Sequence, residues 1–170
     1  MNRAYLLIGG NMGDRMANLK RACEEIERRC GTILAKSSVY RTAAWGAEDQ
    51  PAFYNQALIL DSPIFPESLM QLLLDIETSM GRVRTGKMGP RVIDIDILFV
   101  EGQLFQTDML KSPHPLMAQR RFALEPLAEI APEAREPFSH KKITTLLAEC
   151  TDPLAVHKLP ADPPSPCNID

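Results

Sequence analysis

The sequence lacks any apolar run that reaches the roughly 20 consecutive residues needed to span a bilayer. Its first residues also lack the basic start and small-residue cleavage site of a secretory signal peptide. We therefore expect a cytoplasmic protein. There is little excess of charge, because the formal net charge is −3 over 170 residues. The sequence thus predicts no overall attraction to nucleic acid or to an anionic membrane, and any anion-binding site must be local.

Cysteine is scarce and carries no recognisable spacing. The four cysteines form no CxxC pair, and no histidine lies at zinc-finger spacing from them. This argues against a disulfide framework and against a structural zinc site. Cys23 and Cys30 are seven residues apart in a predicted helix, so we expect them to be buried as small apolar side chains.

Composition and length predict one folded unit followed by a tail. The hydrophobic fraction of 45% and the charged fraction of 24% are typical of globular domains. No internal repeat is visible. We expect a single domain over residues 1–159, because this length suits one hydrophobic core. Residues 160–170 contain four prolines and two aspartates, so we expect a poorly ordered tail.

The first half of the chain predicts one helix among strands. Residues 4–8 form a short apolar run that suits a buried strand. Asp14 offers an N-cap for a helix whose apolar residues recur at three- and four-residue spacing until Gly31 ends it. The β-branched stretch 32–41 and the run 53–60 suit two further strands.

The second half completes a recognisable order. A proline-introduced helix ends at Gly81, and a strand covers residues 92–100. The order β-α-β-β-α-β predicts an α+β fold of ferredoxin-like type, with an antiparallel sheet and helices packed on it. In the C-terminal extension that follows, we expect short helices at 116–121 and 143–150, separated by the apolar stretch 122–132.

Two aspartates share one face of the last predicted strand. Because strand side chains alternate, Ile93, Ile95 and Ile97 can face the core while Asp94 and Asp96 project from the other face. Their Cα atoms should lie about 6.6 Å apart. Carboxylate oxygens at this spacing suit Mg²⁺, which completes its coordination with water and phosphate oxygens.

A basic stretch without acidic residues precedes the aspartates. It carries four cations: Arg82, Arg84, Lys87 and Arg91. Guanidinium groups bind phosphate oxygens in bidentate fashion, so metal and nucleotide could be held together here. The pattern alone leaves a second interpretation open, in which an edge strand has two solvated aspartates and a basic loop that neutralises them.

The segment KMGPRVIDIDIL resembles the signature of the 6-hydroxymethyl-7,8-dihydropterin pyrophosphokinase family, in which a glycine, a proline or small residue, an arginine and DxD follow in order. Five more blocks match the family in its order: LLIGGNMGDRMANL, VYRTAAWG, DQPAFYNQA, ETSMGRVR and SPHPLMAQRRF. The resemblance covers roughly residues 4–132.

The resemblance implies an ATP-dependent diphosphokinase of folate biosynthesis. The hydroxymethyl oxygen of the dihydropterin would attack the β-phosphorus of ATP, giving the pterin diphosphate and AMP. Two Mg²⁺ ions would be held by Asp94 and Asp96, with Arg82 and Arg91 as catalytic arginines. We expect only small-molecule substrates, no nucleic acid or membrane partner, and a monomer.

The resemblance also implies which residues bind each substrate. The ATP-binding residues would be Arg82, Arg84, Arg91, Lys111, His114 and Arg120. The pterin-binding residues would be Thr42, Ala43, Ala44, Trp45, Phe53, Asn55 and Phe122. Glu77 matches a family glutamate, and we expect it to orient Arg82 or a loop. Ala43 and Ala44 replace prolines common in the family, and Met88 replaces a tryptophan of some members.

Two other classes of protein fit part of the sequence. A non-catalytic ferredoxin-like module could bind RNA or a nucleotide through the basic stretch. It fits the aspartate pair poorly, because two carboxylates repel phosphates unless a metal intervenes. A regulatory domain that offers its prolines to partners is the other alternative, but no PxxP context supports it strongly.

Overall fold

The computed structural model describes residues 1–44, 49–83 and 90–161. Its first seven elements are β1 (Asn2–Gly10), α1 (Arg15–Arg29), β2 (Thr32–Lys36), β3 (Tyr40–Thr42), β4 (Phe53–Ser62), α2 (Pro66–Ser79) and β5 (Asp94–Val100). The others are β6 (Phe105–Gln106), β7 (Lys111–Ser112), the 3₁₀ helix η1 (Met117–Gln119), α3 (Arg121–Ile130), α4 (Ile143–Glu149) and β8 (Val156–Lys158). Among these residues, no helix is long and apolar enough to cross a membrane.

The main sheet is antiparallel and has the expected ferredoxin-like order. Its strands run β5-β1-β4-β3-β8, and β2 also pairs with β4. Since β2 and β3 together take the place of one strand, the α+β, β-α-β-β-α-β prediction is confirmed. β6 and β7 form a separate two-stranded sheet.

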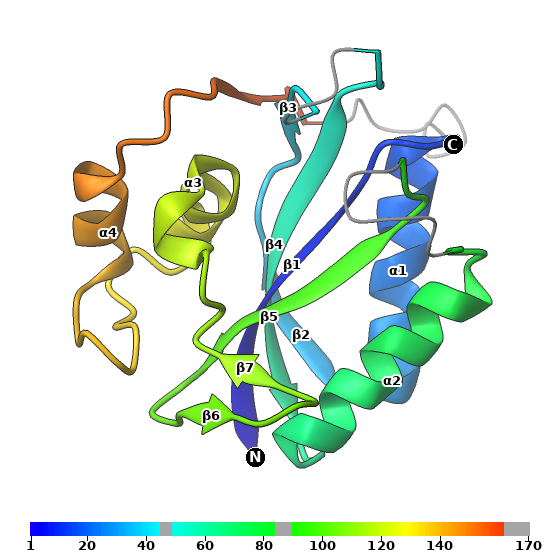
Figure 1. The fold of residues 1–170 in the computed structure, drawn as a ribbon. Helices are drawn as coiled ribbons and strands as arrows, with labels where there is room; N and C mark the ends of the chain where they lie inside the picture. Colours follow the sequence, from blue (N-terminus) through cyan, green and yellow to red (C-terminus); the bar gives the residue numbers. More distant parts are fainter. Residues whose placement is uncertain (45–48, 84–89, 162–170) are drawn as a thin grey trace, which may run out of the picture.

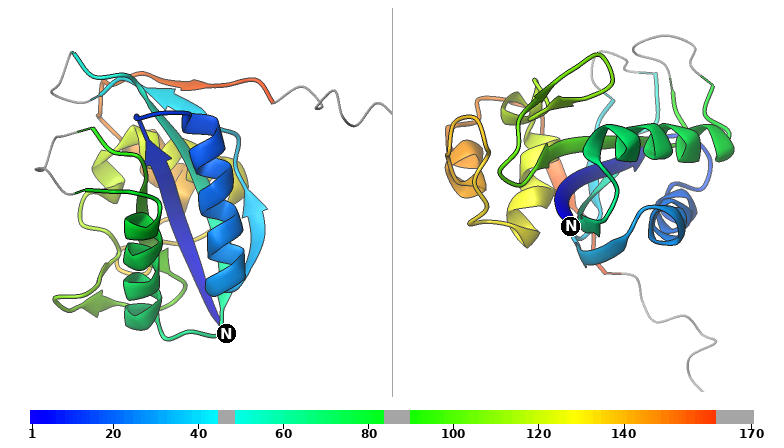
Figure 2. Two further views of the ribbon diagram at one scale, coloured as in Figure 1. Left: turned by 90° about the vertical axis from the view of Figure 1, so that its right-hand side faces the viewer. Right: turned by 90° about the horizontal axis from the view of Figure 1, so that it is seen from below.

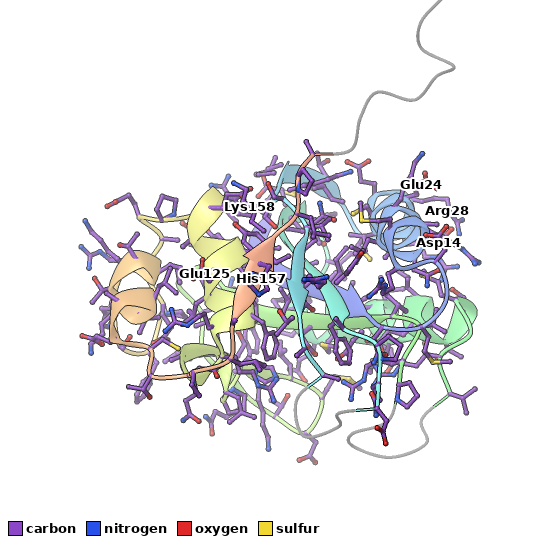
Figure 3. All side chains as sticks on the ribbon, turned by 90° about the horizontal axis from the view of Figure 1, so that it is seen from above. Asp14, Glu24, Arg28, Glu125, His157 and Lys158 are labelled. Atoms are coloured by element: carbon purple, nitrogen blue, oxygen red, sulfur yellow. The ribbon has the colours of Figure 1, made fainter. Side chains whose placement is uncertain are left out.

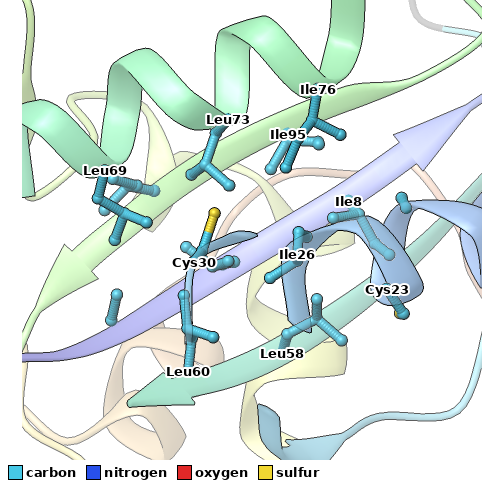
Figure 4. Packing of buried hydrophobic residues seen from close by; sticks show 14 of the residues in the cluster. Ile8, Cys23, Ile26, Cys30, Leu58, Leu60, Leu69, Leu73, Ile76 and Ile95 are labelled. Atoms are coloured by element: carbon cyan, nitrogen blue, oxygen red, sulfur yellow. The ribbon is translucent and has the colours of Figure 1, made fainter. Parts of the chain in front are cut away.

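Helices cover both faces of the sheet, as Figure 1 shows with α1 and α2 on the right and α3 and α4 on the left. The views in Figure 2 agree with this separation. Alternation along β1 serves both layers, because Leu6 and Ile8 join the core under α1 and α2 while Tyr5 and Leu7 join the core under α3 and α4. Figure 4 shows part of the core under α1 and α2.

The helix α1 begins and packs as its sequence predicts. Asp14 accepts a hydrogen bond from the Ala17 N–H at 3.1 Å, which caps the helix. Cys23 and Ile26 are buried along its inner face, and Cys30 is buried just beyond its last residue. The prediction that these two cysteines act as small core residues is confirmed.

The single strand predicted over residues 32–41 is wrong, because the chain divides into β2 and β3. Between them, the Ser37 N–H donates to the Ala57 carbonyl, and the Ser37 hydroxyl accepts from the Ala57 N–H, both at 2.9 Å. The serine side chain thereby replaces a backbone partner of the ladder. A bulge between Ile33 and Ala35 in the β2 register adds to the break.

The C-terminal extension differs more from expectation. The helix expected at 116–121 is η1, and α3 begins separately at Arg121 and takes in most of the apolar stretch, with Pro126 inside it. The predicted helix at 143–150 is confirmed as α4. β8 was not predicted. Most of the expected tail, 162–170, lies outside the described residues.

Candidate active site

A cavity of about 850 Å³ opens on the sheet face that α3 and α4 cover only in part. Strand residues form its floor: Leu7, Gly9, Thr42, Phe53, Asn55, Asp94 and Asp96. Loop and helix residues form its walls: Ala43, Ala44, Gln50, Arg91, Leu116, Gln119, Arg120, Phe122, Thr151, Asp152, Pro153 and Leu154. Six of the seven residues expected to bind the pterin are therefore brought together. The seventh, Trp45, lies outside the described residues.

The floor depends on strand alternation and on one close approach. Asp94 lies opposite Gly9, and Asp96 lies opposite Leu7, in the antiparallel β1–β5 register. A Cβ atom at Gly9 would stand 2.1 Å from the Asn55 Oδ1, closer than any real contact. Glycine at this position therefore lets the Asn55 amide lie over β1 and reach the cavity.

Two arginines hold the first aspartate. The Arg82 Nη1 lies 2.5 Å from the Asp94 Oδ1, and the Arg91 Nη1 lies 3.0 Å from the Asp94 Oδ2. Arg82 also donates to the Glu77 Oε1 at 3.1 Å, and the Glu77 side chain is buried. The arrangement matches the expectation that Glu77 orients Arg82. Arg84 and Lys87, the other cations of the basic stretch, lie outside the described residues.

The second aspartate has an unusual environment. Burial, reinforced by the carboxylates of Asp94 and Glu77, raises the pKa of Asp96 to about 7, although Arg120 and Arg82 oppose the shift. A carboxyl group in this setting gains stability when a cation comes close. The alternative of two solvated aspartates fits Asp96 poorly, although Arg82 and Arg91 neutralise Asp94 as that alternative expects.

Asn11 is a site residue that the sequence reasoning missed. Its side-chain Oδ1 accepts from the Arg91 N–H at 2.9 Å, and its own N–H donates to the Arg91 carbonyl at 3.0 Å. The Asn11 Nδ2 reaches the Pro51 carbonyl and the Gln50 side chain. This buried amide ties the end of β1 to both loops beside the cavity. The only signal in the sequence was its place directly after two glycines.

A smaller cavity of about 270 Å³ lies beside the first. Its lining comprises Met70, Asp96, Ile97, Asp108, Met109, Leu110, Lys111, His114 and Pro115. Lys111 and His114, both expected to contact ATP, thus lie together, while Arg120 lines the larger cavity. Burial and the Arg120 guanidinium lower the pKa of His114, which favours the neutral ring. Asp96 lines both cavities and so marks where they meet.

The aromatic and hydroxyl groups of the larger cavity suit a flat polar ring. The Arg91 guanidinium carbon lies 5.7 Å from the Phe53 ring centroid, and that of Arg120 lies 5.5 Å from the Phe122 ring centroid. The Thr42 hydroxyl is buried and has no hydrogen-bond partner among the described residues. A buried polar group without a partner is costly, so a ligand that meets it would gain affinity.

Comparison with known proteins finds relatives over most of the chain. The family model for 7,8-dihydro-6-hydroxymethylpterin-pyrophosphokinase matches residues 5–132. A 2-amino-4-hydroxy-6-hydroxymethyldihydropteridine pyrophosphokinase of Methylorubrum extorquens is 45% identical over 134 residues, which cover 78% of this chain and 85% of that protein. The protein of the same name from Aquifex aeolicus is 36% identical over 151 residues, covering 89% of this chain and 94% of that protein.

A solved structure shows the same fold at lower identity. The crystal structure of Plasmodium falciparum HPPK-DHPS with pteroate superposes with a TM-score of 0.72 at 15% identity, over 87% of this chain and 42% of that chain. This chain therefore spans less than half of that larger protein. With a family model covering most of its length and relatives above 30% identity, the chain belongs to the 7,8-dihydro-6-hydroxymethylpterin-pyrophosphokinase family.

Proposed function

We propose that this protein transfers the pyrophosphoryl group of ATP to the hydroxymethyl oxygen of 6-hydroxymethyl-7,8-dihydropterin, giving the pterin diphosphate and AMP in folate biosynthesis. One observation carries the proposal: Asp96 lines both cavities, one with aromatic walls and one with His114 and Lys111. A pterin in the first and a nucleotide in the second would bring their reacting groups together at β5.

The larger cavity supports a pterin as the acceptor. Phe53 and Phe122 offer ring faces for stacking on a flat heteroaromatic molecule. The Asn55 amide can both donate and accept at the polar edge of such a ring, and the Thr42 hydroxyl lacks a protein partner among the described residues. We propose that these side chains, with Ala43, Ala44 and Trp45, bind the pterin.

The aspartate pair fits Mg²⁺, and we propose that Asp94 and Asp96 hold two such ions. Within the described ranges, no three His, Cys, Asp or Glu side chains are grouped as a metal site. Two carboxylates suffice for Mg²⁺, because water and phosphate oxygens provide its other ligands. When bound, the ions would offset phosphate charge and orient the triphosphate.

The arginines would stabilise the transition state. The hydroxymethyl oxygen of the pterin forms a bond to the β-phosphorus and loses its proton to water. The bond from that phosphorus to the α–β bridging oxygen breaks, and AMP leaves with that oxygen. Arg82 and Arg91 already converge on Asp94 at hydrogen-bond distance. Cations placed in advance beside the triphosphate need little reorganisation during the reaction. Arg84, Lys111, His114 and Arg120 complete the proposed ATP site.

The identity of the nucleotide product, AMP or ADP, tests the proposal. Purified protein is incubated with ATP, Mg²⁺ and 6-hydroxymethyl-7,8-dihydropterin, and the nucleotides are separated and measured. We expect AMP in equal amount to the pterin diphosphate. Formation of ADP would contradict pyrophosphoryl transfer, and binding without turnover would favour the non-catalytic module.

The monomeric state and the cytoplasmic location remain predictions. Light scattering tests the monomeric state.

A further inference from the structure

The C-terminal strap, defined as residues 150–159, lies beyond the residues that match the family model. It leaves the end of α4, passes the mouth of the larger cavity and ends as β8 beside β3. Thr151, Asp152, Pro153 and Leu154 line the cavity. Figure 3 shows β8, with His157 and Lys158 labelled, between α3 and β3. The strap therefore borders the proposed pterin site and lies between two elements of that site, α3 and β3.

One end of the strap is fixed to the start of α3 through a reciprocal exchange. The Asp152 Oδ2 accepts from the Arg121 N–H at 3.1 Å. The Arg121 side chain in turn donates from its Nε to the Asp152 carbonyl at 3.2 Å and from its Nη2 to the Cys150 carbonyl at 3.0 Å. The other Asp152 oxygen accepts from the Leu154 N–H at 3.0 Å, which fixes the carboxylate in place.

This exchange caps the N-terminus of α3, which its own N-cap residue does not do. The N-cap residue of α3, Arg120, makes no side-chain capping hydrogen bond. Asp152 reaches the first helical N–H from a distant part of the sequence and also places a negative charge at the helix N-terminus, where it is favourable. The first turn so held carries Phe122, and Arg120 directly precedes it. Both residues line the cavity.

The other end of the strap is fixed to β3. Val156 lies opposite Thr42 and Lys158 lies opposite Tyr40 in the antiparallel pairing. The Leu159 N–H adds a hydrogen bond to the Val39 carbonyl at 2.8 Å. The strap thus joins the strand that ends at Thr42 to the helix that begins beside Phe122.

We propose that Asp152 is a positioning residue of the pterin site, acting through α3 to hold Phe122 in its place in the lining of the cavity. The inference rests on the proposed function, because it concerns binding of the same pterin. Asp152 need not touch the substrate. Its removal should loosen the pterin cavity and leave the Lys111 and His114 cavity largely unaffected, since the strap does not line the latter.

The test measures binding of each substrate to the full chain by calorimetry. Pterin is titrated in the presence of Mg²⁺ and an ATP analogue whose α–β bridge is methylene, and the analogue is titrated separately. For Asp152→Ala we expect the pterin Kd to rise on the order of three- to tenfold, which corresponds to the loss of one or two hydrogen bonds. The Kd of the analogue should rise by a smaller factor than that of the pterin, because Arg120 of the proposed ATP site adjoins the turn that Asp152 holds, while Lys111 and His114 lie in the other cavity. Asp152→Asn, which keeps one acceptor oxygen, should be intermediate.

A matched control separates positioning from general stability. Asp14→Ala removes the cap of α1, whose Asp14 does not line the cavity, so it should lower the melting temperature without raising the pterin Kd. If Asp152→Ala leaves the pterin Kd unchanged, or if Asp14→Ala raises it equally, the positioning role is overturned. If the unmodified protein fails to bind pterin at all, the proposed function itself fails.

Discussion

The Oε2 of Glu77 accepts the backbone N–H of Ile95 at 2.7 Å, between the two site aspartates. β5 is an edge strand, so this N–H points away from β1 and needs a partner outside the sheet. The same carboxylate binds Arg82 through its other oxygen. One buried side chain of α2 therefore fixes both the strand that carries the aspartates and an arginine that faces them.

Replacing Glu77 by alanine should destabilise the protein as well as inactivate it. The change leaves a buried N–H without its acceptor and removes one partner of a partly buried guanidinium, so we expect unfolding in urea to need roughly 2–4 kcal/mol less free energy. The matched control is Glu24→Ala on the exposed face of α1, which should change stability by less than about 0.5 kcal/mol. Equal effects of the two changes would contradict the role given to Glu77.

Asp96→Asn should separate activity from stability. The charged form of Asp96 is disfavoured by burial and by nearby carboxylates, so a neutral amide should leave the metal-free protein at least as stable. AMP formation should be lost at every Mg²⁺ concentration, because an amide is a poor ligand for this ion. Thermal melts without metal and a nucleotide assay over a Mg²⁺ series check both parts. Near-normal turnover would refute the metal assignment.

Arg91→Ala should reduce turnover more than it weakens ATP binding. Its guanidinium is held beside Asp94, and its backbone is fixed by Asn11, so it is placed before the reaction begins. We expect kcat to fall on the order of 100-fold and the Kd of the methylene ATP analogue to rise only a few-fold. Arg3→Ala, at an exposed ion pair with Asp61, is the control and should leave kcat unchanged. A loss confined to affinity would place Arg91 in ground-state binding.

Much of the core and of the site follows from local pattern. The isoleucines that alternate with Asp94 and Asp96 are buried, and the Asp14 cap and the α1 stripe lie where periodicity predicts them. The family resemblance added the residues that we propose for pterin and ATP binding. Of those that the structure describes, all but Arg82 line one of the two adjacent cavities, and Arg82 contacts Asp94. Predictions from periodicity and from motif order succeed because both are properties of contiguous residues.

The parts that were missed depend on long-range pairing. β8 is three residues long and exists because β3 offers an edge, so no sequence window around it signals a strand. The apolar stretch in α3 gives no clear helix prediction, because Pro126 removes a helical N–H. Burial of Leu124 and Leu127 against the sheet overrides that local penalty. Asn11 was missed because its partner, Arg91, is 80 residues away.

The contact between α3 and β3 should make the free energy of unfolding fall at acidic pH. Burial raises the pKa of Glu129, but hydrogen bonds from Tyr40, Ser38 and Lys158 outweigh it and leave that pKa below its ordinary value. The stabilisation is therefore complete above the unfolded pKa of about 4.3 and is lost as pH falls through the lower folded value.

Urea unfolding at several pH values between 7 and 3 measures this dependence. The difference in unfolding free energy between the unmodified protein and Glu129→Gln should be largest at neutral pH and should shrink below about pH 4.3. Glu149→Gln, in an exposed ion pair with Lys141, should show almost no such difference. A constant difference across the range would rule out the linkage.

Thr42→Val should stabilise the substrate-free protein against unfolding and weaken substrate binding. The Thr42 side chain is buried on β3, and its hydroxyl has no partner in the described part of the chain. Valine keeps the branched shape that suits a strand and removes the unpaired hydroxyl, so the free energy of unfolding should rise on the order of 1 kcal/mol. If the pterin provides the missing partner, its Kd should rise by about two- to tenfold. Thr42→Ser makes the reverse change, because it keeps the hydroxyl and loses a buried methyl group. Serine should therefore lower stability and largely preserve pterin affinity, and a loss of affinity in serine but not in valine would show that the methyl group, rather than the hydroxyl, recognises the substrate.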